Sequence, residues 1–312
     1  MAFSHISSIL LLLFFFFFTS RVNSTTFTFT NNCQTTVWPG TLSNAGSAPL
    51  QTTGFELPSG ESRSIQAPTG WSGRFWARTG CTLSPSNHLS CSTGDCGSGQ
   101  LECAGSGAAP PATLAEFTLS GPLSSKDFYD VSLVDGYNVP VIVQPTGGCA
   151  TTGCTVDLNL RCPSELRVGE GAACRSACEA FGTAEYCCSG EYANPSACRP
   201  TAYSEMFKAA CPRSYSYAFD DPTSTFTCPG PADYAITFCP SSPSSSSPSQ
   251  KSSMDMDGST NAPTTKGVVL EGGESWLANL AMGDATSSRR DFSILYQFSL
   301  TLVTLLLVLI HY

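Results

Sequence analysis

Charged residues are scarce in this chain of 312 residues, and histidine is scarcer, since only 12% of the residues are charged and three are histidine. The 15 lysines and arginines are outnumbered by 24 acidic residues, which argues against nucleic acid as a partner, because affinity for phosphates depends on basic side chains. His5 and His311 lie in apolar terminal segments, so only His88 remains for a folded domain. A metal site with several histidines is therefore excluded, and neither a metal nor another cofactor is expected.

The N-terminus carries an apolar run that is too short to span a membrane. Ile9–Phe18 is ten residues of isoleucine, leucine and phenylalanine, a length typical of the central part of a secretory signal peptide. Val22 and Ser24 supply the small residues that precede a cleavage site. We therefore predict a signal peptide over residues 1–24 and a secreted mature chain.

A second apolar run closes the chain at Phe292–Ile310, and it follows small residues and a polar spacer. This order is the signal for a glycosylphosphatidylinositol (GPI) anchor. We predict attachment at Gly283 or Asp284, with residues 284–312 removed as a propeptide. A retained membrane span and a vacuolar propeptide are the alternatives. The span is disfavoured because an arginine pair would lie on its lumenal side, against the positive-inside tendency.

Between the two ends, one low-complexity segment marks the limit of the folded domain. Residues 241–283 begin with a serine- and proline-rich stretch and contain no cysteine. Such a segment buries too little apolar surface to offset the entropy of ordering it, so we interpret it as a stalk. The folded domain is then residues 25–240, where 10 basic and 18 acidic residues give a net charge of −8.

All 16 cysteines lie in this domain, and an even number in a secreted chain is typical of a disulfide framework, here of eight bridges. Zinc is the competing interpretation, because Cys174 and Cys178 are spaced like ligands and Cys187 is followed by Cys188. The oxidising compartment and the lack of a second zinc-like pair favour disulfides. The count alone leaves the pairing open.

Alternation of apolar and polar residues predicts mostly strands. The expected strands are Thr25–Thr30, Gly73–Arg78, Thr113–Leu119, Asp127–Val134 and Val139–Val143. Two helices are expected, over Gly171–Phe181 and Ser204–Ala210. Many short strands joined by glycine- and proline-rich turns indicate a mainly β protein, a β-sandwich with a small helical, disulfide-rich lobe. We assign the sandwich core to residues 25–78, 111–155 and 212–240 and the helical lobe to residues 156–211.

Residues 91–103 resemble the signature of the thaumatin family. The Cys-x-Thr-Gly-Asp-Cys core and the downstream cysteine are intact, whereas Asn87 and Leu89 depart from the usual residues upstream. Similar blocks occur over residues 71–81, 113–117, 129–140, 185–188 and 221–229. The resemblance covers residues 25–240 and is to plant thaumatin-like, pathogenesis-related proteins of family 5. It implies the thaumatin-like β-sandwich, with a small disulfide loop lobe over residues 79–110.

The resemblance also implies how the cysteines pair. The implied bridges are Cys33–Cys239, Cys81–Cys91, Cys96–Cys103, Cys149–Cys228, Cys154–Cys211, Cys162–Cys174, Cys178–Cys187 and Cys188–Cys198. The first of them would tie the first strand to the end of the domain.

An acidic cleft between the sandwich and the helical lobe is a further implication of the resemblance. By motif position its residues are Arg74, Glu116, Asp130, Asp135 and Asp220. Carboxyl groups gathered around one arginine have pKa values that repulsion raises and the guanidinium lowers. A glycosidase needs two carboxyl groups with separated pKa values. Four aromatic residues nearby in sequence are candidates for stacking on sugar rings, namely Trp76, Phe128, Tyr129 and Tyr137.

Strand parity sets a condition on this cleft. Asp130 and Asp135 are five residues apart, so they would lie on opposite faces of a straight strand. Both can serve one cleft only if the chain bends before the Asp135-Gly136 turn signal.

Three functions fit these features. The first is a defence protein that binds β-1,3-glucan of fungal walls, anchored to the outer face of the plasma membrane in the cell wall and acting as a monomer. The second is a weak endo-β-1,3-glucanase with Glu116 as general acid and Asp135 or Asp130 as its partner. The third is a structural or signalling wall protein without antifungal action.

Overall fold

The computed structural model describes residues 24–122 and 124–241. The predicted signal peptide up to residue 23, the stalk beyond residue 241 and the anchor site at Gly283 or Asp284 lie outside the described residues. Within the described part, no helix is long and apolar enough to cross a membrane.

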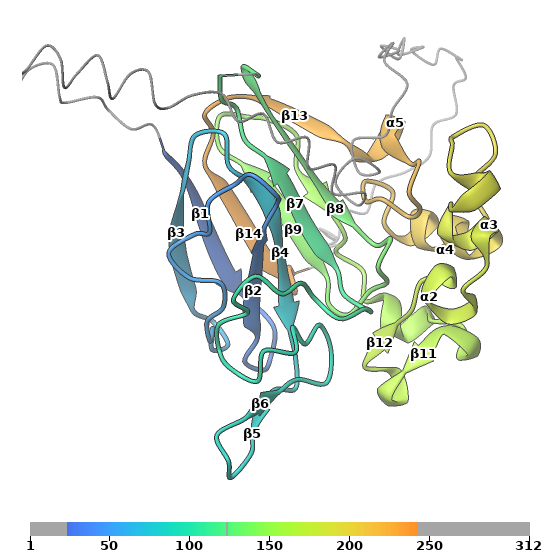
Figure 1. The fold of residues 1–312 in the computed structure, drawn as a ribbon, viewed down its shortest axis with the longest axis horizontal. Coiled ribbons are helices and arrows are strands. Elements are labelled where there is room, and N and C mark those ends of the chain that lie inside the picture. Colours follow the sequence, from blue (N-terminus) through green and yellow to red (C-terminus); the bar gives the residue numbers. More distant parts are fainter. Residues whose placement is uncertain (1–23, 123, 242–312) are drawn as a thin grey trace, which may run out of the picture.

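Two five-stranded sheets face each other in this part of the chain (Figure 1). The first has the order β10 (Thr152–Gly153), β9 (Val141–Pro145), β14 (Tyr234–Phe238), β1 (Ser24–Asn31) and β3 (Ser62–Pro68). The second has the order β13 (Phe226–Pro229), β8 (Lys126–Ser132), β7 (Leu114–Thr118), β4 (Ser72–Arg78) and β2 (Trp38–Ser43). The expected β-sandwich is therefore confirmed.

Smaller elements flank the sandwich. The short hairpin of β5 (Thr82–Leu83) and β6 (Leu89–Ser90) projects from one end of it in Figure 1. The helices gather at one side and are α2 (Ala177–Phe181), α3 (Ala184–Cys187), α4 (Ala202–Ala210) and α5 (Asp221–Ser224). Near them lie β11 (Arg167–Val168), β12 (Ala173–Cys174) and the 3-10 turns Leu158–Arg161, Ser164–Leu166, Gly169–Gly171 and Gly190–Tyr192.

Aromatic rings fill the space between the two sheets. Strand β1 alternates threonine and phenylalanine, so Phe27 and Phe29 point inward while the threonines between them face outward. The Phe27 ring packs edge-on against Phe75 and Phe117 of the second sheet, with centroids 4.8 and 4.7 Å away. Edge-to-face contacts of this kind stabilise a core beyond the area that they bury.

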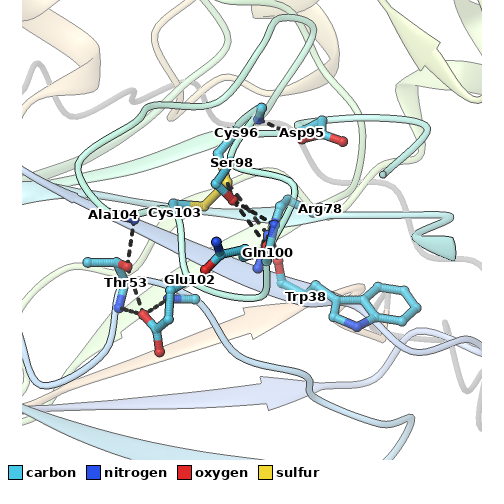
Figure 2. Close-up of a disulfide and its surroundings, with 12 residues drawn as sticks. Trp38, Thr53, Arg78, Asp95, Cys96, Ser98, Gln100, Glu102, Cys103 and Ala104 are labelled. Carbon is cyan, nitrogen blue, oxygen red and sulfur yellow. Dashed lines mark hydrogen bonds between the residues drawn. A yellow bond between two sulfur atoms is a disulfide. The ribbon is translucent and has the colours of Figure 1, made fainter. Parts of the chain in front are cut away.

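The loop lobe covers one end of the outer face of the second sheet. Arg78, at the end of β4, is only 1% exposed and donates hydrogen bonds to the carbonyl oxygens of Trp38 and Leu101, at 3.0 and 2.7 Å. Figure 2 shows its guanidinium beside the Cys96–Cys103 disulfide. On the far side of this bridge, Glu102 accepts hydrogen bonds from the backbone of Thr53 and Gly54. These contacts fix the loop lobe on the sheet.

Eight disulfides join the 16 cysteines, and they are the eight pairs that the resemblance implies. Cys33–Cys239 connects residues 206 apart, just after β1 and just after β14. No cysteine of the described chain is free.

The helix expected over Gly171–Phe181 is wrong in its first half. Cys174 lies in β12, which pairs with β11 in a short hairpin, and the helix begins only after Ser176. The Ser176 hydroxyl accepts a hydrogen bond from the Glu179 amide, which is the usual cap of a helix N-terminus. The second expected helix is confirmed as α4, which starts two residues earlier than Ser204.

Candidate functional site

A row of charged side chains crosses the outer face of the second sheet. In its register Arg74 of β4 lies opposite Glu116 of β7, which in turn lies opposite Asp130 of β8. Directly opposed residues bring their side chains together on one face, with Cβ atoms about 5 Å apart. Three of the five residues of the implied cleft are thus immediate neighbours.

The ion pair in this row is loose. Arg74 Nε lies 3.7 Å from Glu116 Oε1, beyond hydrogen-bond distance, and the two side chains are 22% and 4% exposed. Burial therefore dominates and raises the pKa of Glu116 to about 7, while the Arg74 charge lowers it and the Asp135 charge raises it further. Glu116 is thus a carboxyl group that holds its proton in mildly acidic solution.

Asp130 is more deeply buried, with no exposed surface. Neither of its carboxylate oxygens has a hydrogen-bond partner among the residues that the structure describes. Burial raises the pKa of Asp130 well above its usual range, and the charges of Glu116 and Asp221 raise it further against the opposing effect of Arg74. Because ionising both carboxyl groups would place two charges against one arginine, Asp130 and Glu116 form a pair that retains protons.

Asp135 joins the row because the chain turns after β8. The strand ends at Ser132, and the Gly136 amide donates a hydrogen bond to the Leu133 carbonyl oxygen, which closes a turn. Gly136 has a φ of +84°, and a Cβ there would lie 2.6 Å from a side-chain atom of Pro111. This turn supplies the bend that strand parity requires. Burial raises the pKa of Asp135, and Arg74 lowers it.

Asp220 has a different set of partners. Its carboxylate lies 3.0 Å from Lys208 Nζ and accepts hydrogen bonds from the backbone and hydroxyl of Ser216. Its neighbour Asp221 is the residue whose charge acts on Asp130, and it also accepts a hydrogen bond from the Tyr215 hydroxyl. The structure therefore brings Arg74 and the first three acidic residues together, whereas Asp220 serves the contact between α4 and α5.

The prediction that four aromatic residues stack on sugar rings is wrong for three of them, because their side chains are buried in the protein. Trp76 is covered by the loop lobe and donates to the Gly94 carbonyl oxygen, and Tyr129 packs between the sheets. Tyr137 belongs to the core of the helical lobe, where its hydroxyl donates to the Val156 carbonyl oxygen. Phe128 is half-buried and shares the face of Asp130. Closeness in sequence to the cleft residues therefore does not show whether an aromatic side chain is accessible. Its strand face and the loops that pack on that face decide this.

A cavity of about 330 Å³ opens where Asp135 meets the helical lobe. Its walls come from α2, α3 and α4 and from the segment around Ser216–Ala218. Asp135 lines it, whereas Glu116 and Asp130 do not. We use "acidic cleft" for Arg74, Glu116, Asp130 and Asp135, and "lobe pocket" for this cavity.

Several side chains that line the lobe pocket were not predicted from the sequence as site residues. Tyr186, Tyr203 and Tyr217 are half-buried in its walls, and Glu179 and Arg199 are exposed there. Tyr186 lies in one of the blocks that carry the resemblance, which is the only sequence signal for any of them. Nowhere in the described ranges are histidine, cysteine, aspartate and glutamate grouped so as to hold a metal ion.

Comparison with known proteins agrees with the fold. The model of the thaumatin family matches residues 31–240. Thaumatin-like protein 1 of Arabidopsis thaliana is 66% identical over 227 residues, covering 70% of this chain and 87% of the relative. Pathogenesis-related protein 5 of the same plant is 57% identical over 225 residues, covering 70% and 92%. A Prunus avium protein named glucan endo-1,3-beta-glucosidase is 52% identical over 225 residues, covering 70% and 91%.

The chain therefore belongs to the thaumatin family, as a thaumatin-like protein of the pathogenesis-related type. Eight disulfides and this membership indicate a secreted protein.

Proposed function

We propose that the protein is a cell-surface defence protein that binds β-1,3-glucan through the acidic cleft and acts against fungi. The observation that carries this proposal is the row of Arg74, Glu116 and Asp130 across three strands, with Asp135 beside it at the mouth of the lobe pocket. Acidic side chains and a guanidinium at the edge of a cavity suit the hydroxyl groups of a neutral polysaccharide.

The exposed and the buried residues of the acidic cleft would have different roles in binding. Arg74 and Asp135 are partly exposed and are the groups that would contact sugar hydroxyls. Glu116 and Asp130 are too deeply buried for direct contact, so they would affect the ligand only through their electrostatic interaction with Arg74. The net charge of −8 over residues 25–240 disfavours attack on anionic membranes, which leaves the polysaccharide as the expected target.

A GPI anchor at Gly283 or Asp284 would hold the domain at the outer face of the plasma membrane, at the end of the stalk over residues 241–283. This part of the proposal rests on the order of small, polar and apolar residues near the C-terminus. The anchor would keep the acidic cleft next to the polysaccharides of the cell wall. The protein would act there as a monomer.

A weak endo-β-1,3-glucanase is the second candidate, and one observation favours it. A pKa of about 7 suits Glu116 to donate a proton as general acid in mildly acidic solution. The Prunus avium relative is named as such an enzyme. Because Glu116 is only 3% exposed, this candidate requires the ligand to open a path to its carboxyl group.

One paired experiment separates these functions. The secreted domain is incubated with insoluble β-1,3-glucan, and the bound fraction is measured together with the release of reducing sugar from a soluble β-1,3-glucan. We expect binding without release. Release that is lost in Glu116→Gln would instead establish the glucanase. Absence of both binding and release would contradict the proposal and leave a structural or signalling role.

A further inference from the structure

The lobe pocket differs in character from the acidic cleft that it adjoins. The sandwich contributes Asp135 and Tyr217, whereas the helical lobe contributes Tyr186, Tyr203 and charged groups of both signs. A cavity of about 330 Å³ lies at the lower end of the range of about 300–1,000 Å³ that small-molecule sites occupy. It is therefore suited to a sugar unit at the end of a chain and too small for a long stretch of polysaccharide.

The walls of the pocket are held rigidly. Helices α2 and α3 contain five and four residues and would be unstable alone, but the Cys178–Cys187 bridge joins them. Cys188–Cys198 ties the next loop to them, and all four cysteines line the cavity. A site whose walls are already fixed loses little entropy when it binds a ligand.

Aromatic rings form one wall. The Tyr186 and Tyr203 ring centroids are 5.8 Å apart in an edge-on arrangement, and Phe181 packs against both at 5.5 and 5.4 Å. Tyr217 lines the pocket from the segment that precedes α5. Half-buried tyrosines offer an apolar ring face together with a hydroxyl group, which is the chemistry that a sugar ring with its C–H and O–H groups requires.

Charged groups stand around these rings. Glu179, on α2, is exposed at the pocket and close enough to Asp135 for the two charges to interact. Partial burial and the charge of Asp135 raise the pKa of Glu179, and Arg175 lowers it. Arg199 lines the same cavity and acts electrostatically on Tyr217. Two carboxyl groups and a guanidinium can thus reach the hydroxyl groups of one small ligand.

We infer that the lobe pocket is a subsite for the terminal sugar of a β-1,3-glucan chain whose following units lie along the acidic cleft. Tyr217 and Tyr186 would pack against the sugar ring, and Glu179 would accept hydrogen bonds from its hydroxyl groups, with Asp135 shared by both parts of the site. This inference rests on the proposed function, since it requires the acidic cleft to bind β-1,3-glucan.

The test measures, by titration calorimetry, the affinity of the disulfide-bonded domain for a linear β-1,3-linked hexasaccharide. Tyr217→Ala should weaken binding by about fivefold, in line with the worth of an aromatic contact, whereas Tyr217→Phe retains the ring and should bind nearly as the wild type. Glu179→Gln should weaken binding by about threefold, because the amide still accepts a hydrogen bond but lacks the charge that strengthens it. The matched controls Tyr192→Ala and Glu205→Gln change residues of the helical lobe that do not line the pocket and should leave the affinity unchanged.

Hydrogen exchange provides a second measurement that needs no variant. Binding of the hexasaccharide to the wild type should slow amide exchange over residues 177–187, which carry α2 and α3. Wild-type affinity in both Tyr217→Ala and Glu179→Gln, or unchanged exchange in α2 and α3 while the hexasaccharide is bound, would overturn the subsite and leave the proposed function standing. A wild type that does not bind the hexasaccharide would overturn the proposed function and the subsite together.

Discussion

Glu116 and Asp130 lie opposite each other on two central strands, and among the described residues the only cation that acts on them is Arg74, partly exposed and 3.7 Å from Glu116. Burying a carboxylate without hydrogen bonds costs several kcal/mol, so a group in this position keeps its proton instead. The acidic cleft therefore carries less negative charge near pH 5 than the count of its carboxyl groups indicates.

The first prediction concerns how stability depends on pH. Folding raises the pKa of Glu116 from 4.5 to about 7, so the folded protein binds more protons than the unfolded chain between these values. The resulting stability is fully present below pH 4.5 and is lost as the pH rises through 7. The free energy of unfolding should fall by roughly 3 kcal/mol across this window, and Glu116→Gln should reduce the fall.

Denaturant unfolding at pH 4.5, 6 and 8 measures this effect. The exposed Glu205 is the matched control, since Glu205→Gln should retain the pH dependence of the wild type. A Glu116→Gln variant whose stability falls as steeply as that of the wild type would show that Glu116 ionises normally in the folded protein.

The second prediction concerns Arg78, whose planar guanidinium donates hydrogen bonds to three carbonyl oxygens, those of Trp38, Gln100 and Leu101. Lysine keeps the charge but cannot reproduce this fork, so Arg78→Lys leaves a buried carbonyl oxygen without its donor. We expect a loss of about 2 kcal/mol in the free energy of unfolding. Arg161→Lys, at an exposed position, should cost less than about 0.5 kcal/mol. Equal melting temperatures for the two variants would contradict this role of Arg78.

At the scale of secondary-structure elements, the turn after β8 decides whether the acidic cleft exists. The strand carries Asp130 on one face, and the turn at Asp135-Gly136 returns the next carboxyl group to the same side. A small change in this turn therefore moves Asp135 without touching the sheet. Under the proposed function, this turn is therefore the element that most directly affects glucan binding.

The third prediction compares two glycines of similar conformation. Gly136 and Gly147 have φ values of +84° and +78°, but a Cβ at Gly136 meets Pro111 and Cys174 within 2.7 Å, whereas a Cβ at Gly147 meets nothing within 4 Å. Both alanine variants carry the cost of about 1 kcal/mol for a left-handed residue. Only Gly136→Ala should cost clearly more in thermal unfolding and lower the fraction bound to β-1,3-glucan. Equal losses in the two variants would contradict the close packing of this turn.

Sequence patterns predict the elements of this fold better than their ends. The strands expected from alternation are present, as Thr25–Thr30 shows, because alternation reports directly which side chains enter the core. The helix expected from Gly171 fails because the spacing of Cys174 and Cys178 fits a helix but arises from a hairpin followed by a capped turn. Local spacing does not reveal this pairing with β11.

The candidate site could likewise be predicted only in part from the sequence. Arg74, Glu116 and Asp130 are brought together by strand register, which the resemblance anticipates. The lobe pocket, and the burial of Tyr137 and Trp76, depend on how the two lobes pack on the sandwich. Such contacts join residues far apart in the sequence, so no local pattern predicts them.

On the scale of the whole molecule, the disulfides cross-link the domain and hold its N-terminal and C-terminal ends next to each other. Cys33–Cys239 holds the start of the chain beside the residues that precede the predicted stalk. If residues 241–283 form the predicted stalk, the domain would be held through this one end.

The fourth prediction concerns the tether, and it is motivated by the small residues, polar spacer and apolar tail near the C-terminus. Phosphatidylinositol-specific phospholipase C should release the protein from membranes of the cells that express it. Deletion of residues 284–312 should yield a protein that is secreted without the enzyme. Membrane-bound protein that resists the phospholipase and still carries its C-terminal apolar run would establish a retained span instead.

The most direct test of the central claim is the fraction of protein bound to insoluble β-1,3-glucan, compared for the wild type, Asp135→Asn and the control Glu191→Gln. Asp135 is the acidic residue that both the acidic cleft and the lobe pocket share, and its amide is isosteric with the acid. Asp135→Asn should weaken binding by about fivefold, because the amide still accepts a hydrogen bond but lacks the charge that strengthens it, while Glu191→Gln binds as the wild type. Wild-type binding by Asp135→Asn, with Glu116→Gln equally unaffected, would show that the acidic cleft is not the working site of this protein.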